Sequence, residues 1–163
     1  MTLSQSIQPV SFGLARPDQV AGLTGLEMLN AMLAGELPAP TMAETLNFIL
    51  TTVSEGEAEF RGTPTDAFYN PMGIVHGGWV MTLLDSALGC SVQTTLAAGE
   101  GYVSLDTDVK FVKAITADTG EVTVTGRVLT RGRQIATAEG RAVDAKGRVL
   151  ALGTSSCLVR PLR

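Results

Sequence analysis

A single carboxylate stands in an otherwise uncharged stretch of the chain. Asp85 is the only formally charged residue among the 33 residues from Ala67 to Gly99. The apolar residues around it recur at helical spacing, so Asp85 is predicted to lie within a mostly buried helix. A buried carboxylate without a partner is costly, and proteins that keep one usually use it for chemistry. The alternative is an Asp on a narrow polar edge of the helix, facing water beside Thr82 and Ser86.

Two glycines precede the same helix, in the sequence His76–Gly77–Gly78. Glycine lets the backbone approach a ligand closely, and the first N–H groups of a helix have no partner within it. Together they could hold a carbonyl oxygen or an oxyanion, or the pair could simply form a tight turn. Asp85 follows about 10–12 Å further along the helix axis, too far to act on the same bound atom. This spacing suggests that Asp85 of one subunit faces the His76–Gly77 turn of another.

Other polar residues near this turn allow two interpretations each. Asn70 begins the turn sequence Asn70–Pro71–Met72–Gly73, so its amide either caps the turn or holds a water or a carbonyl group. His76 has no acidic neighbour in the sequence, which favours a role in fixing the turn. Cys90 follows the apolar helix and is a poor candidate for a nucleophile. The aromatic residues Phe68, Tyr69 and Trp79 could suit an aryl group or a flexible chain.

The elements that must position these residues follow from hydrophobic periodicity. The apolar positions of residues 18–34 predict one helix, and a second helix begins after His76 and ends between Gly89 and Gly99. From residue 103 the period changes to two, with Val103, Leu105, Val109 and Phe111 on one side of a strand. The predicted strands are 44–53, 56–63, 103–111, 122–128, 135–143 and 149–159, the last four forming a meander. The fold class is therefore α+β, with an antiparallel sheet wrapped around one hydrophobic helix.

Composition limits the classes of function. The formal net charge is −4, which argues against a dedicated nucleic-acid binder. One His and two Cys make a metal site improbable. The uncharged first 15 residues lack the basic region of a signal peptide, and no apolar run is long enough to span a bilayer, so a cytoplasmic protein is expected. Residues 1–100 carry a charge of −8 and residues 101–163 carry +4, so the late strands either attract a polyanionic small molecule or are merely solvated.

The stretch Asn70-Pro71-Met72-Gly73-Ile74-Val75-His76-Gly77-Gly78, followed by Leu83-Leu84-Asp85, resembles the signature of hotdog-fold acyl-CoA thioesterases of the phenylacetate-degradation type. The segment from Tyr102 to Val159 is similar to the sheet of that family. The resemblance covers about residues 41–160, which implies a hotdog domain over 41–163. Residues 1–40, with their one predicted helix, resemble an extension found in some members.

The resemblance implies hydrolysis of an aromatic or medium-chain acyl-CoA without metal or cofactor. Asp85 would be the nucleophile or general base, and the Gly77 N–H would polarise the thioester carbonyl beside Gly78 in the same turn. Asn70 would orient water or the carbonyl, His76 would support the turn, and Ser104 would assist the carboxylate. Members of the family assemble their sites across subunits, which implies a homodimer or homotetramer. The basic residues that could meet the CoA phosphates are Lys110, Lys113, Arg131 and Arg133.

Two other functions are compatible with the same fold. A hotdog dehydratase or hydratase needs a catalytic His paired with an acid, whereas the one His of this chain lies in the glycine turn. A non-catalytic acyl-CoA binding protein has little need for the carboxylate of Asp85. Both alternatives rank below the hydrolase.

Overall fold

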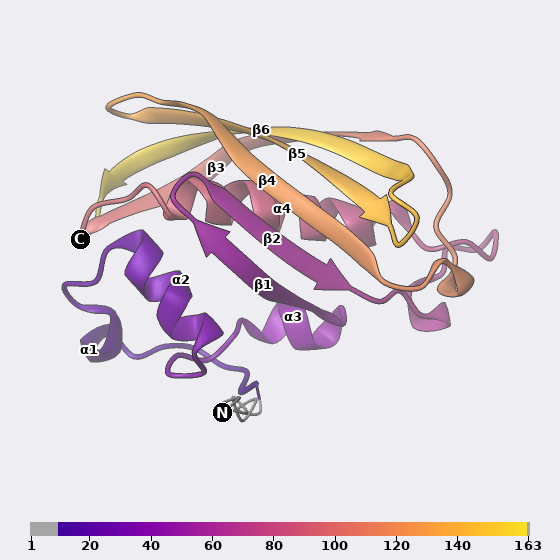
Figure 1. Ribbon diagram of the computed structural model, residues 1–163, viewed down its shortest axis with the longest axis horizontal. Helices are drawn as coiled ribbons and strands as arrows, with labels where there is room; N and C mark the ends of the chain where they lie inside the picture. The colour runs from indigo at the N-terminus through magenta and orange to yellow at the C-terminus, as the bar shows by residue number, and fades with distance from the viewer. Residues whose placement is uncertain (1–9, 163) are drawn as a thin grey trace, which may run out of the picture.

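A six-stranded antiparallel sheet curves over one long helix in the computed structural model, which describes residues 10–162 (Figure 1). The helix is α4 (Gly77–Gln93), and the strand order is β1-β2-β4-β5-β6-β3. The strands are β1 (Phe48–Ser54), β2 (Glu57–Gly62), β3 (Glu100–Phe111), β4 (Val122–Arg131), β5 (Ile135–Asp144) and β6 (Val149–Pro161). The predicted α+β class and the central hydrophobic helix are confirmed.

The core lies between α4 and the concave face of the sheet. Leu83, Leu84 and Leu88 of α4 have no exposed surface, and they pack against the small inward residues of β4, β5 and β6. Gly126 and Gly140 pair across β4 and β5 directly above the helix. A Cβ on Gly126 would overlap the carbonyl oxygen of Ala87, so glycine is what lets the helix backbone approach the sheet.

The predicted helix over residues 18–34 is wrong in one respect, because the chain breaks it into α1 (Pro17–Val20) and α2 (Gly25–Leu33). Gly22 takes a positive φ of 82°, and Thr24 then caps α2 by accepting the N–H of Glu27. A third short helix, α3 (Thr41–Thr45), occupies the start of the strand predicted over 44–53. Residues 1–9 of the predicted extension lie outside the described part of the chain.

The last four strands do not form the predicted meander. β3 pairs only with β6, at the far edge of the sheet, while β4 lies between β2 and β5. The ten residues from 112 to 121, which include the short helix η2 (Ala117–Thr119), connect β3 to β4 across this distance. One edge of β3 is therefore without a partner strand within residues 10–162.

A β-bulge in β3 changes which of its residues face α4. The register with β6 shifts between Ser104 and Asp106, so the strand does not keep a strict period of two through Leu105. Val103 and Leu105 are 39% and 56% exposed, whereas Thr107 and Val109 are half-buried on the helix side. The expectation that Val103, Leu105, Val109 and Phe111 share one side is thus wrong.

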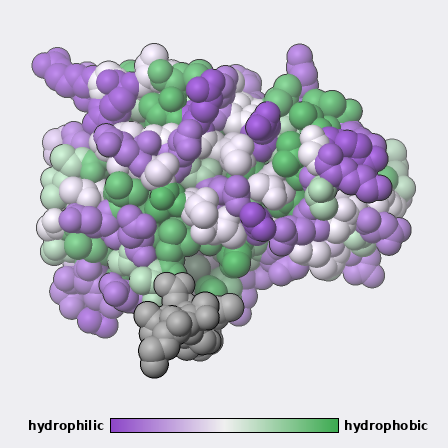
Figure 2. All heavy atoms as spheres, in the orientation of Figure 1, coloured by the Kyte–Doolittle hydropathy of each residue, from purple (hydrophilic) through white to green (hydrophobic). Residues whose placement is uncertain are grey.

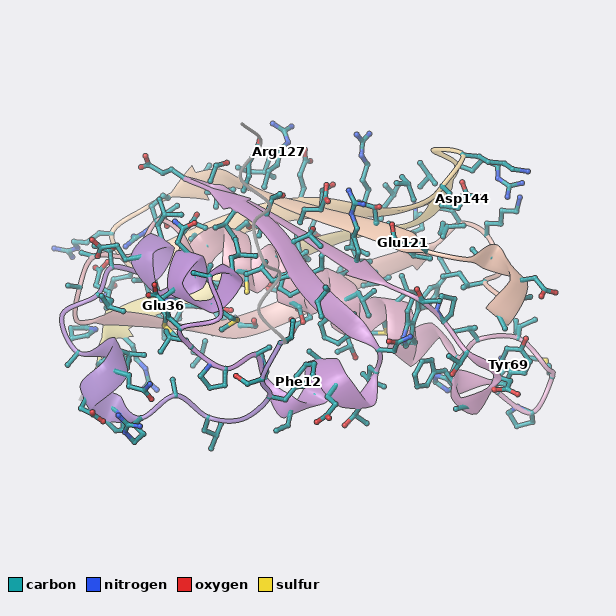
Figure 3. The ribbon with its side chains drawn as sticks, turned by 60° about the horizontal axis from the view of Figure 1, so that its bottom comes forward. Phe12, Glu36, Tyr69, Glu121, Arg127 and Asp144 are labelled. Atoms are coloured by element: carbon teal, nitrogen blue, oxygen red, sulfur yellow. The ribbon has the colours of Figure 1, made fainter. Side chains whose placement is uncertain are left out.

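The surface is mixed in character. The face in Figure 2 shows hydrophobic side chains in separate areas between polar ones. Figure 3 shows Arg127, Glu121 and Asp144 along the sheet and Tyr69 in the loops before α4, after the short helix η1 (Asp66–Phe68). No helix within residues 10–162 has the length and apolar character needed to cross a membrane.

Candidate active site

Asp85 projects from the exposed edge of α4 and is held by a hydroxyl from β3. The Thr107 Oγ1 donates a hydrogen bond to Asp85 Oδ1 over 2.7 Å. The Asp85 side chain is exposed in the single chain, with Thr82 and Ser86 half-buried beside it, as the polar-edge alternative predicted. The expectation of a buried carboxylate is therefore wrong for one copy of the chain.

The hydroxyl predicted to assist Asp85 was Ser104, but the structure places Thr107 there instead. Ser104 lies beside the thiol of Cys157 on the neighbouring strand. Burial raises the pKa of that thiol, and the hydrogen bond with Ser104 partly offsets this effect. The bulge after Ser104 is the reason, because it brings Thr107 onto the helix side. No local sequence pattern marks this bulge, so Thr107 was missed.

The N-terminus of α4 presents one free backbone donor. His76 is the N-cap residue, and its Nδ1 accepts the N–H of Gly78 over 3.0 Å. The N–H of Gly77 has no hydrogen-bond partner within residues 10–162. His76 thus supports the turn as predicted from the sequence, and Gly77, rather than Gly78, is left to hold an oxygen atom.

Asn70 fixes the loop that leads to this turn. Its Oδ1 accepts the N–H of Met72 over 2.9 Å and that of Ile74 over 3.4 Å, and its backbone N–H donates to Ile74. The side-chain oxygen therefore has the turn-capping role that the sequence allowed. The side-chain NH₂ has no partner within the described residues, so it is the part of Asn70 that can donate to a ligand.

The two ends of the candidate site do not meet within one chain. Asp85 lies eight residues after Gly77, which is about 12 Å along the helix axis. One carbonyl group cannot contact both. Of the predicted site residues, the structure brings together only those of the turn, which are Asn70, His76, Gly77 and Gly78.

The four predicted CoA-binding cations do not gather at one place. Lys110 lies on the outer face of the sheet, while Lys113 follows the end of β3. Arg131 Nη2 contacts Glu100 Oε2 at 3.1 Å, at the opposite end of β3, and Arg133 lies in the nearby β4–β5 turn. Arg131 is half-buried in this ion pair, which is a structural role.

Burial keeps the side chains of Cys90 and Tyr102 neutral. Burial raises the pKa of the Cys90 thiol to about 12, with a smaller contribution from the negative charge of Asp85. Burial also raises the pKa of Tyr102, whose hydroxyl lies against Gly89. Cys90 is therefore protonated at neutral pH, which agrees with the prediction that it is a poor candidate for a nucleophile.

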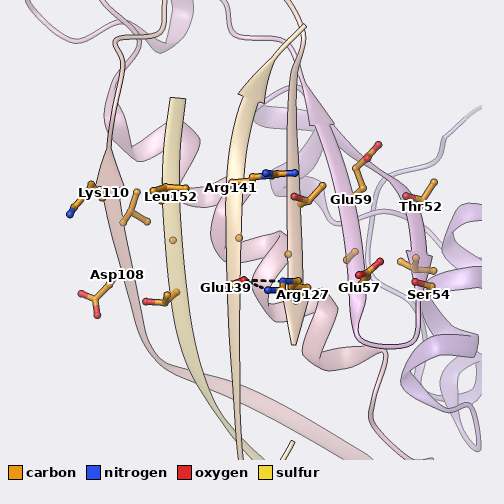
Figure 4. A pocket seen from close by; sticks show the side chains of 18 residues that line it. Thr52, Ser54, Glu57, Glu59, Asp108, Lys110, Arg127, Glu139, Arg141 and Leu152 are labelled. Carbon is orange, nitrogen blue, oxygen red and sulfur yellow. Dashed lines mark hydrogen bonds and ion pairs between the residues drawn. The ribbon is translucent and has the colours of Figure 1, made fainter. Parts of the chain in front are cut away.

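Asp85 does not line the cavity that lies on the sheet. This cavity has a volume of about 1040 Å³ and lies on the outer face of the sheet, between the side chains of β1 and those of β3 (Figure 4). Arg127 and Glu139 form an ion pair across it, and Lys110 and Arg141 also line it. The described residues contain no group of three or more His, Cys, Asp and Glu side chains that could hold a metal ion.

Comparison with known proteins places this arrangement in a family. The sequence profile of the Thioesterase superfamily matches residues 72–151, which include His76, Gly77, Asp85 and Thr107. A thioesterase-like protein of Ralstonia eutropha, described as phenylacetic acid degradation-related, is 31% identical with a TM-score of 0.72. The match covers 79% of this chain and 97% of that protein. The chain belongs to the thioesterase superfamily.

More distant solved structures share the fold of this superfamily member. The PaaI protein from the phenylacetic acid degradation operon of Escherichia coli is 22% identical, with a TM-score of 0.72 over 86% of this chain and 96% of that one. A Streptococcus mutans protein bound to acetyl-CoA is 23% identical, with a TM-score of 0.65 over 72% of this chain and 91% of that one. No curated protein matches the chain.

Proposed function

We propose that the protein hydrolyses acyl-CoA thioesters at sites shared by two copies of the chain. In each site, Asp85 of one copy acts on the thioester whose carbonyl oxygen binds the Gly77 N–H of the other copy. The acyl group is aromatic or of medium length. Membership in the thioesterase superfamily supports the reaction, and the crystal structure of the Streptococcus mutans protein with acetyl-CoA supports the type of substrate.

The observation that carries this proposal is that α4 bears both an accessible carboxylate and, at its N-terminus, a backbone N–H without a partner among the described residues. Asp85 is fixed by the 2.7 Å hydrogen bond from Thr107, which leaves its other oxygen, Oδ2, available. The Gly77 N–H is the donor left over after His76 has capped Gly78. A thioester hydrolase needs both a base or nucleophile and a donor to the carbonyl oxygen.

The reaction follows from these two groups. Asp85 either removes a proton from water, which attacks the carbonyl carbon, or attacks that carbon itself and forms an anhydride that water then hydrolyses. In both cases the C–S bond breaks, the sulfur leaves as the CoA thiolate, and the products are the free acid and CoA. The backbone dipole of Gly77 stabilises the negative charge that develops on the carbonyl oxygen. A thiolate is a good leaving group, so no strong acid is needed beside it.

A second copy fits the surface beside Asp85. The unpaired edge of β3 is 12 residues long and exposes Val103 and Leu105. Met81, one turn before Asp85 on α4, is 38% exposed. Antiparallel pairing of two β3 strands would satisfy this edge and would place two α4 helices in opposite directions, so that Gly77 of one approaches Asp85 of the other.

The test is thiol release from a panel of aryl and straight-chain acyl-CoAs. We expect Asp85→Ala and Asp85→Asn to lower kcat at least about 100-fold, because each removes the base or nucleophile. Asp108→Asn is the matched control, since Asp108 lies on the same strand as Thr107 but on the outer face of the sheet. We expect its kcat to stay at the wild-type value.

Two results would contradict the proposal. Equal rates for wild type and both Asp85 variants would remove Asp85 from the mechanism. Binding of acyl-CoA without any thiol release would instead identify the chain as a non-catalytic acyl-CoA binding protein.

A further inference from the structure

Phe111, the last residue of β3, lies against the N-terminus of α4. The tip of its ring is so near Gly77 that a Cβ there would lie 2.8 Å from Phe111 Cζ. The residue is nevertheless 54% exposed, so much of the ring surface is uncovered in the single chain. Sequence periodicity placed Phe111 on an apolar side of the strand but did not connect it with Gly77.

The position of Phe111 follows from the direction of β3. This strand runs antiparallel to α4, so that Tyr102 meets Gly89, Thr107 meets Asp85 and Phe111 meets Gly77. The three contacts place Phe111 at the end of the strand where the free N–H is found. Its ring therefore lies beside the residue that carries this N–H.

The other aromatic residues near the turn have structural contacts. Trp79 is 3% exposed, donates its Nε1–H to the carbonyl oxygen of Leu46 over 2.8 Å, and stacks on Phe68. The hydroxyl of Tyr69 accepts the N–H of Ala117. Of these aromatic side chains, Phe111 is the one with an exposed ring in contact with Gly77.

We propose that Phe111 determines acyl-group specificity by forming the wall against which the acyl group packs, an inference that rests on the proposed function. An oxygen accepting the Gly77 N–H lies about 2.9 Å from that nitrogen, so groups on its carbonyl carbon lie beside the ring. The acyl group is the apolar part of the substrate, and the ring is apolar, whereas the side chains of Asn70 and His76 in the same turn are polar. A flat acyl group gains most, because aromatic rings attract each other in offset or edge-to-face arrangements.

The experiment measures binding of ketone analogues in which a CH₂ group separates the CoA sulfur from the carbonyl, so that no hydrolysis occurs. The three ligands are phenacyl-CoA, 2-oxoheptyl-CoA and free CoA, titrated by calorimetry into the full-length protein. For Phe111→Ala we expect the Kd of phenacyl-CoA to rise by about 2- to 12-fold more than that of 2-oxoheptyl-CoA. The Kd of free CoA should not change.

Two further variants keep the result interpretable. Phe111→Leu retains an apolar side chain, so it provides the test if Phe111→Ala fails to fold. We expect it to lose the preference for the aryl ligand in the same way as Phe111→Ala. Leu152→Ala is the matched control, because Leu152 is 42% exposed on the neighbouring strand but lines the outer face of the sheet. We expect it to bind all three ligands as the wild type does.

Several outcomes would overturn the inference. Equal weakening of all three ligands would place Phe111 against the pantetheine arm, and unchanged binding would remove it from the site. A wild type that binds none of the ligands would also refute it. Thiol release is measured separately: a wild type that binds the analogues as expected but releases no thiol would refute the proposed hydrolysis and leave the assignment of Phe111 standing.

Discussion

Thr107 gives Asp85 a fixed orientation at the level of single residues. An aspartate on an exposed helix edge has several rotamers, and a hydrogen bond from a neighbouring hydroxyl selects one of them. A bond to a charged acceptor is also stronger than one between neutral groups. The hydroxyl comes from β3, so the helix and the edge strand position the carboxylate together.

Removal of this hydroxyl tests its role. We expect Thr107→Val, which keeps the shape of the side chain, to lower kcat by about 10- to 100-fold, the equivalent of one hydrogen bond to a charged group. Ser104→Ala should cost much less, because the hydroxyl of Ser104 lies beside Cys157. Steady-state kinetics of the two variants decide which hydroxyl assists Asp85. A larger loss of kcat for Ser104→Ala than for Thr107→Val would contradict the role of Thr107.

The sequence was sufficient to place the residues of α4 and its turn, because their positions depend on neighbours in the chain. The positions of His76, Gly77 and Asp85 followed from residue type and helical spacing, while their catalytic roles stay predictions. Thr107 and Phe111 could not be placed in this way, since they reach α4 through strand pairing. The bulge at Leu105 moves Thr107 to the helix side, and a strict period of two cannot reveal it.

At the level of elements, the contact between α4 and the sheet depends on glycine. The pair Gly126–Gly140 leaves room for the helix backbone, with Gly126 directly opposite the carbonyl group of Ala87. A backbone atom cannot move aside as a side chain can. The prediction of a sheet wrapped around a helix required only the apolar pattern, but the closeness of the two elements is set by these glycines.

Stability measurements can compare two glycines on the inner face of the sheet. We expect Gly126→Ala to lower the free energy of unfolding by about 3 kcal/mol, because the new Cβ overlaps backbone atoms of α4. In Gly153→Ala the Cβ would make ordinary contacts, 3.4 Å from the Asp108 oxygen and 3.5 Å from Leu84, so a change within about 1 kcal/mol is expected. Urea unfolding measures the stability of both variants. Similar stabilities would be inconsistent with the close approach of the α4 backbone to Gly126.

At the level of the whole molecule, the proposed function links assembly to activity through the edge position of β3. The strand that supplies Thr107 and Phe111 is also an edge strand, with no partner on one side within residues 10–162. A second copy that pairs there would cover the edge of α4 that carries Asp85 and exclude water from it. The ten-residue connection from β3 to β4 across the sheet was not predictable from local periodicity, because the order of strands in a sheet depends on contacts far apart in the chain.

Mixed dimers test whether the site is shared. Asp85→Ala and Gly77→Pro should each be inactive alone. Proline is tolerated at the first position of a helix, and His76 already has the extended ψ of 134° that a following proline requires. When the two variants are coexpressed, half of the dimers contain both, and each of these has one intact site of two, so about a quarter of wild-type activity should return. The absence of any recovered activity would indicate that both groups act within one chain.

The cap on α4 also fixes the tautomer of the single histidine. Because His76 Nδ1 accepts the N–H of Gly78, that nitrogen carries a lone pair, and the proton of the neutral imidazole resides on Nε2. The ring thus offers its surroundings an N–H and no basic nitrogen. Proton abstraction from a carbon next to a thioester, on which a hydratase or dehydratase depends, would require His76 to release the start of α4 first.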